Sequence, residues 1–187
     1  MTTDPTTGRE AAPTRGGARA RSPLGRWWRH LRCDHRTVAR AFGHDALDAI
    51  EAAVVAAERR HAAELRFVIE ADLSAAQLWA GTTPRERALE VFSHLRVWDT
   101  EHNAGVLVYV LWADHAAEIV ADRGIAARVP QAEWDVVVAQ MTAAFAQGRC
   151  REGAVGAVEA VGALLARHFP ADERSRANEL PDRPALI

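Results

Sequence analysis

The 187-residue sequence contains no lysine, so arginine supplies all 23 of its basic side chains. The formal net charge is nevertheless only -2, because 25 acidic residues offset the arginines. A chain this close to neutrality has no general electrostatic attraction to the phosphate backbone. We therefore expect no specific nucleic-acid partner.

Cysteine is also scarce, and the two thiols, Cys33 and Cys150, lie far apart in the sequence. This pattern is neither a disulfide framework nor a CxxC zinc motif, although it leaves a single bridge open. No apolar run reaches the ~18 residues of a membrane span, and the N-terminal region lacks the apolar segment of a signal peptide. These observations predict a cytoplasmic protein without a transmembrane segment.

Hydrophobic residues make up 49% of the chain, enough for one domain with a sizeable core. Composition divides the chain into three parts: residues 1–33, a disordered arm rich in arginine; residues 34–169, an α/β domain; and residues 170–187, a polar tail.

From Arg9 to Arg32 the arm carries arginines at positions 9, 15, 19, 21, 26, 29 and 32 against a single acid, Glu10, and it includes Trp27 and Trp28. Basic residues beside interfacial aromatics are suited to weak contact with an anionic membrane surface through residues 9–32. The alternative is a solvated tail whose tryptophans cover one edge of the domain, and this reading is favoured.

Hydrophobic periodicity predicts the secondary structure of the domain. Helices are expected over 35–41, 45–60 (with Asp45 as N-cap), 74–79, 84–98, 125–129, 131–146 and 152–168, and strands over 64–70, 105–112 and 116–122. The first two strands flank a helical crossover and should pair in parallel, whereas the last two form an antiparallel hairpin. The predicted fold is α/β and Rossmann-like, with a small mixed sheet flanked by helices on both faces.

Acidic and amide side chains gather at one end of the predicted hairpin. Asp99, Glu101 and Asn103 precede its first strand, and Asp122 ends its second, so all four should meet at one rim. Such oxygen ligands suit Ca²⁺ or Mg²⁺, and Arg123 and Glu101 could contact a phosphate or a partner. The competing interpretation is that Asp99 and Asn103 cap the loop through side-chain-to-backbone bonds.

Two other kinds of site, a zinc site and a reactive cysteine, have weaker support in the sequence. His94, His102 and His115 appear nearest to this rim, but no HxxxH pair on one helical face supports a zinc site. Arg149 and Arg151 flank Cys150 and would lower the pKa of its thiol if they lay close to it, but the favoured interpretation is a small residue in a tight interhelical turn.

Residues 87–125 resemble the centre of the TPM domain family. Asn103–Leu107 matches a polar residue followed by GVL and an apolar strand, and Val120–Ile125 matches the strand-end segment. Farther on, Phe145–Arg149 with Gly153 resembles the F–G–Y–G segment of the family. The resemblance covers about residues 45–168.

The resemblance implies a helix-flanked mixed sheet with an ion and phosphate cleft at the polar segment before GVL. Family members are linked to photosystem II repair and to modulation of a neuronal receptor, some have been described as acid phosphatases, and some bind calcium. By motif position Asp99, Asn103 and Asp122 carry over. Asp122 stands where the family usually has glycine, a departure that favours cation binding or another role over phosphatase activity.

Three functions follow from the sequence, in this order of preference. The first is a non-enzymatic accessory or assembly module that binds a protein partner, with a divalent cation at the acidic cleft. The second is a metal-dependent acid phosphatase, and the third a membrane-surface adaptor that uses the basic arm.

Overall fold

The computed structural model describes residues 23–100, 102–171 and 179–187. Its centre is a four-stranded sheet in the order β3-β2-β1-β4, formed by β1 (Glu64–Glu70), β2 (Gly105–Leu111), β3 (Ala116–Ala121) and β4 (Ala185–Leu186). Strand β1 pairs in parallel with β2, and β2 pairs antiparallel with β3. The predicted crossover and hairpin are therefore confirmed, as is the α/β fold class.

The crossover from β1 to β2 contains two short helices, α4 (Ala75–Ala80) and α5 (Pro84–His94). Each begins with a capping box, Ser74 with Gln77 and Thr83 with Glu86, in which side chains satisfy the free backbone N–H groups of the first turn. Helix α5 ends at His94, four residues before the predicted end at residue 98, because the following residues turn toward β2.

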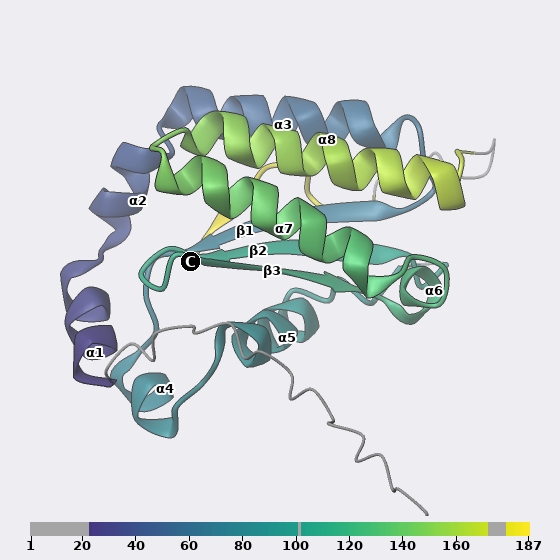
Figure 1. Cartoon of the computed structure of the whole chain (residues 1–187). Coiled ribbons are helices and arrows are strands. Elements are labelled where there is room, and N and C mark those ends of the chain that lie inside the picture. The colour runs from purple at the N-terminus through teal and green to yellow at the C-terminus, as the bar shows by residue number, and fades with distance from the viewer. Residues whose placement is uncertain (1–22, 101, 172–178) are drawn as a thin grey trace, which may run out of the picture.

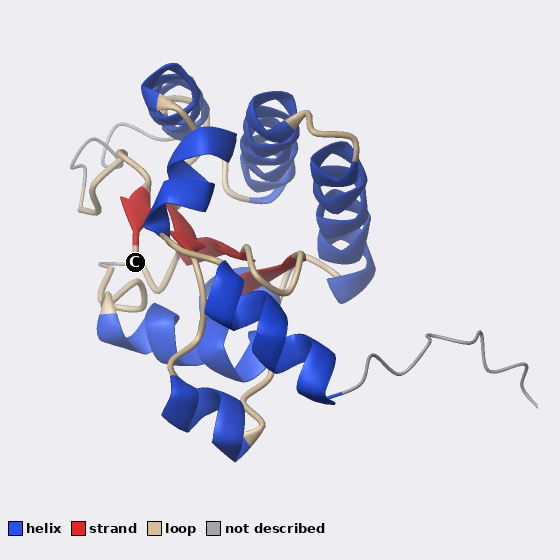
Figure 2. Cartoon of the chain, turned by 90° about the vertical axis from the view of Figure 1, so that its left-hand side faces the viewer, coloured by secondary structure: helices blue, strands red, loops and turns tan. Residues whose placement is uncertain are grey.

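Helices cover both faces of the sheet (Figures 1 and 2). On one face lie α3 (His44–Glu58), α7 (Gln131–Ala146) and α8 (Cys150–His168), and on the other lie α4 and α5. Alternation along β2 separates the two cores, since Val106, Val108 and Val110 join the cluster under α3, α7 and α8, whereas Leu107, Tyr109 and Leu111 face α4 and α5. All seven residues of β2 are buried, as its uninterrupted apolar sequence predicts.

Part of the arm predicted to be disordered is helical. Helix α1 spans Pro23–Arg32, and after two residues α2 (His35–Ala41) leads into the domain. The arginines at positions 9 to 21 lie outside the described residues. Inward-facing polar groups hold α1 in place, as described below, so counting apolar residues alone did not reveal it.

The predicted polar tail also contributes to the fold. Strand β4 pairs in parallel with β1 through Ala185 and Leu186, and Ile187 donates to the carbonyl of Ile69 at 3.0 Å. The Arg66 side chain donates to the carbonyls of Pro181 and Arg183 and fixes the approach to this strand. The last residues thus cover an edge of β1 that would otherwise present unpaired backbone groups.

Smaller differences concern the other helices. Helix α3 begins at His44 with Gly43 as N-cap, so Asp45 lies inside its first turn. Between Asp122 and Pro130 the helix is α6 (Arg123–Ala126), which begins two residues and ends three residues before the predicted bounds. Among the described residues no helix is long and apolar enough to cross a membrane.

Candidate functional site

Asp122 lies at the rim where β3 ends and β2 begins. Its backbone N–H donates to the carbonyl of Gly105 at 2.8 Å, and its own carbonyl accepts from Ile125 and Ala126. The carboxylate Oδ1 accepts the Arg123 N–H at 2.6 Å and caps α6. The other oxygen, Oδ2, is buried and has no hydrogen-bond partner among the described residues. Asp122 as a whole is only 6% exposed. A buried carboxylate oxygen without a donor is costly and has few structural explanations.

The loop before β2 packs directly against Asp122 and its neighbours. A Cβ added to Gly124 would lie 2.7 Å from the carbonyl oxygen of Asn103, and one added to Gly105 would lie 1.8 Å from that of Val97. Both glycines are therefore required by close backbone approach rather than by a special φ angle. Asn103 itself has φ of 51°, in the left-handed region that asparagine tolerates.

The predicted rim residues are brought together only in part. Asn103 lies against Gly124, two residues after Asp122. Asp99 is exposed in the turn that follows α5, and its backbone N–H donates to Arg96. Arg123 is exposed beside Asp122, and Glu101 lies outside the described residues. The cap of this loop is Thr100, whose hydroxyl accepts the Ala104 N–H at 2.9 Å.

The described side chains that could ligate a metal ion are dispersed. Within residues 23–100, 102–171 and 179–187, no three His, Cys, Asp or Glu side chains form a group that could hold a metal ion. The placement of His115 near the rim was wrong, because it occupies the β2–β3 turn at the opposite end of the hairpin. There its ring packs edge-on against Trp112, 6.0 Å between centroids.

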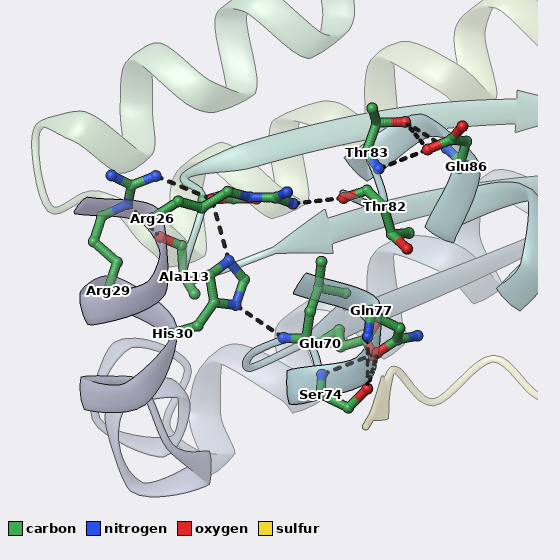
Figure 3. Close-up of polar contacts among 12 residues, drawn as sticks. Arg26, Arg29, His30, Glu70, Ser74, Gln77, Thr82, Thr83, Glu86 and Ala113 are labelled. Carbon is green, nitrogen blue, oxygen red and sulfur yellow. Dashed lines mark hydrogen bonds and ion pairs between the residues drawn. The ribbon is translucent and has the colours of Figure 1, made fainter. Parts of the chain in front are cut away.

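That opposite end holds a polar cluster that the sequence did not reveal (Figure 3). Asp114, in the turn, has a side chain only 8% exposed and accepts from Arg26 at 2.9 Å and Arg29 at 3.1 Å. Arg26 also donates to the carbonyl of Thr82 at 2.7 Å, and Arg29 to that of Ala113 at 3.2 Å. Two arginines of α1 therefore fasten this helix to the sheet turn and to the loop before α5.

His30 completes the cluster and is 2% exposed. Its Nδ1 accepts the Leu73 N–H at 2.9 Å, which places the ring proton on Nε2, 3.2 Å from Asp114 Oδ1. Burial alone would raise the pKa of Asp114, but the hydrogen bonds from His30, Arg26 and Arg29 outweigh it and hold that pKa well below its usual value. Asp114 is therefore an anion at every physiological pH.

A pocket of about 290 Å³ lies beside this cluster, between α1, the start of α2 and the β2–β3 turn. Trp28, Arg32, Trp112 and His115 are among its lining residues. The pocket sits where β2 ends, and the carboxyl ends of strands are the usual place for ligands in open α/β sheets. The paired tryptophans at 27 and 28 were the only sequence signal of this region.

The remaining polar side chains of interest have structural roles. Glu70 accepts two bonds from Arg87 Nε and one from Nη2 at 2.9 to 3.1 Å, and one from the Tyr109 hydroxyl at 2.6 Å, which ties β1 and β2 to α5. Both cysteines are free. Burial raises the pKa of Cys33 to about 11, and it also raises the pKa of Cys150, which counts against the weaker alternative that the neighbouring arginines activate Cys150.

Comparison with known proteins agrees with this architecture. A search of curated proteins gave no match. Among solved structures, the NMR structure of the BA42 protein from the psychrophilic bacterium Bizionia argentinensis is similar, with 29% sequence identity and a TM-score of 0.67. The similarity covers 76% of this chain and 93% of that one. The TPM domain model matches residues 38–164, more than half of the chain. The chain therefore belongs to the TPM domain family.

Proposed function

We propose that this TPM domain is a non-enzymatic accessory module that binds a protein partner at the Asp122 rim, with a divalent cation, Ca²⁺ or Mg²⁺, held there. The observation that carries the proposal is the buried Oδ2 of Asp122, which no described donor satisfies. A cation coordinated by this oxygen would remove the desolvation cost of an unpaired charge.

The oxygen atoms near Asp122 are suitable ligands for a hard cation. Backbone carbonyls of His102 and Asn103 face Gly124, within 3.2 Å and 2.7 Å of the position its Cβ would take. Calcium accepts carboxylate, amide and backbone carbonyl oxygens in flexible geometry, so a full set of acidic side chains is unnecessary. Asp99, Asn103 and Asp122 remain the proposed side-chain ligands, and the oxygen-only set is unlike the N/S ligands that zinc prefers.

Exposed groups around the rim support a protein partner. Trp98 is 48% exposed beside Asp99, and Arg123 is exposed next to Asp122. Tryptophan and arginine supply much of the binding energy in protein interfaces. We propose Arg123 and Glu101 as contacts to the partner, with the cation fixing the shape of the loop before β2.

The thiols support a non-enzymatic role. A raised pKa keeps Cys33 and Cys150 protonated at neutral pH, and a protonated thiol is a weak nucleophile. One feature favours the second candidate, a metal-dependent acid phosphatase: Arg123 stands beside the proposed cation ligand Asp122, where a guanidinium could hold a phosphate.

The cation is tested by calorimetric titration and thermal unfolding of the full chain with CaCl₂ and MgCl₂. We expect either ion to raise the melting temperature of the wild type and Asp122→Asn to abolish the shift. The asparagine can still accept the Arg123 N–H, so the helix cap is retained. Glu159→Gln, an exposed acid on α8, is the matched control and should keep the shift. An equal response of Asp122→Asn and wild type would refute the site.

The partner and the enzyme are tested separately. Proteins captured by the wild type, but not by Trp98→Ala or Arg123→Ala, should bind the purified chain in calorimetry, and Ca²⁺ should strengthen that binding. Equal binding by all three chains contradicts the rim assignment. Hydrolysis of a phosphomonoester that is lost in Asp99→Ala/Asp122→Ala would replace the accessory role by the phosphatase.

A further inference from the structure

Helix α1 exposes three apolar side chains, whereas Trp27 and three polar side chains face the domain. Leu24, Trp28 and Leu31 are 74%, 65% and 71% exposed, and their spacing of four and three residues places them on one face. The opposite face carries Arg26, Arg29 and His30, all bonded to the domain. We call the exposed set Leu24, Trp28 and Leu31 the outer stripe.

The orientation of α1 is fixed by specific bonds. Three side chains converge on Asp114, and a fourth bond joins Arg26 to Thr82 (Figure 3). Cys33, just after the helix, donates from Sγ to the carbonyl of Ala71 at 3.1 Å. Rotating the stripe inward would break all of these contacts, turn Arg26 and Arg29 out to solvent and leave the buried Asp114 without them. The domain therefore presents the stripe outward as a stable part of its structure.

Charge distinguishes the surfaces that the stripe could meet. Between residues 23 and 41 the sequence has arginines at 26, 29, 32, 36 and 40 and a single acid, Asp34. Arg32 and Arg36 are exposed. Two copies of the chain facing each other through α1 would bring these guanidinium groups together, which opposes a dimer. An anionic surface instead attracts them.

We propose that the outer stripe of α1 docks the protein on an anionic lipid bilayer. Exposed Leu and Trp side chains flanked by arginine are the composition of helices that lie in the membrane interface. Tryptophan favours the headgroup region, where its ring is apolar and its N–H can bond. Arg32 lines the pocket next to Trp28 and is placed to meet a lipid phosphate there. The arginines at 9, 15, 19 and 21 precede α1 in the sequence and add to the same attraction.

This surface is independent of the proposed cation rim. Helix α1 contacts the turn after β2, whereas the rim lies at the start of β2. In Figure 1 α1 and α6 lie at opposite ends of the sheet. The chain could therefore bind a bilayer and a partner at the same time.

The test is flotation of the full chain with vesicles of phosphatidylcholine, alone or mixed with phosphatidylglycerol. We expect the protein to float only with the anionic vesicles and salt to weaken its binding. Leu24→Ser/Trp28→Ser/Leu31→Ser should lower the vesicle affinity about tenfold or more, because it removes the apolar area that enters the interface. Trp98→Ser, an exposed tryptophan at the rim, is the control and should bind like the wild type.

Fluorescence quenching tests directly whether Trp28 enters the lipid. Brominated phospholipid should quench part of the wild-type fluorescence, and Trp28→Phe should lose that part while it still floats. Thermal unfolding of each variant verifies folding, and Trp28→Ser alone replaces the triple variant if the latter unfolds. Failure of the wild type to float, undiminished flotation of the stripe variants, or a concentration-dependent dimer that these variants dissociate would overturn the proposal.

Discussion

Glu58 couples the protonation of a single carboxyl to the stability of the domain. Its Oε1 accepts the Leu65 N–H at 2.9 Å and so joins the end of α3 to the start of β1. Burial, with smaller repulsion from Glu64 and Asp182, raises the pKa of this carboxyl to about 8. The folded chain therefore holds a proton that the unfolded chain releases at about pH 4.3.

The sign of the pH effect follows from this difference. Because its pKa is raised in the folded state, Glu58 does not lower the free energy of unfolding below the unfolded pKa of about 4.3. Between that pH and pH 8 it lowers this free energy increasingly. Glu58→Gln stays neutral and can still accept the Leu65 N–H. We expect it to raise the free energy of unfolding by about 1 kcal/mol or more at pH 8 and by little at pH 5.

Urea denaturation at a series of pH values measures this effect. The exposed Glu159→Gln should follow the wild type at every pH. A gain for Glu58→Gln that is the same at pH 5 and pH 8 would show that Glu58 is not protonated in the folded state.

At the rim, single residues show what could and could not be predicted from the sequence. The position of Asp122 next to the loop before β2 was predictable, because an antiparallel hairpin places the end of one strand beside the start of the other. Its role as the N-cap of α6 and its unsatisfied Oδ2 depend on side-chain packing that periodicity does not encode. His115 was misplaced because its turn joins the far ends of the same two strands.

Among the elements, α1 depends most on one side chain. Asp114→Asn keeps the shape of the acceptor but removes the charge that Arg26, Arg29 and His30 share. Hydrogen bonds to a charged group contribute about 1.5–3 kcal/mol each, so we expect α1 to open at least about tenfold more often. Trypsin cleavage after Arg26 and Arg29, measured by mass spectrometry, should accelerate accordingly.

Acid should have the same effect on the wild type. Because the folded pKa of Asp114 is depressed, its stabilisation is present above the unfolded pKa of about 3.9 and is lost as the pH falls below it. The Leu73 N–H donates to His30, so its rate of hydrogen exchange reports on the opening of α1 and needs no protease. Asp135→Asn, an exposed acid on α7, should leave both readouts unchanged, and equal protection in Asp114→Asn would contradict the anchor.

Elements were predicted best where one pattern runs over many residues. The strand at residues 64–70 and the helix at residues 131–146 have the predicted bounds, because each combines a long apolar period with a clear start and end. Strand β4 was missed because two paired residues after a proline give no period. Helix α1 was missed because its arginines face the domain, the reverse of the usual pattern.

At the scale of the molecule, the two cores share one sheet and should unfold together. Leu65 belongs to the core under α3, α7 and α8, and Leu107 to the core that faces α4 and α5. Both are fully buried, on neighbouring strands. We expect Leu65→Ala and Leu107→Ala each to lower the free energy of unfolding by about 2–5 kcal/mol.

Far-UV circular dichroism and tryptophan fluorescence in urea should give coincident transitions for both variants, as two-state unfolding requires. Leu89→Ala, on the half-exposed outer side of α5, should cost about 0.5 kcal/mol or less. Separate transitions for the two probes would mean that one face of the sheet melts before the other.

The loop at residues 99–103 is held at both ends by backbone contacts. Gly105 lies under the Val97 carbonyl, and Gly124 lies under that of Asn103. Neither contact uses a loop side chain, so side chains other than the capping Thr100 and the left-handed Asn103 can be replaced while both contacts are preserved. A related protein with the same two glycines would keep both anchors while the other loop side chains vary, and a designer could graft a new sequence at those positions without redesigning the fold.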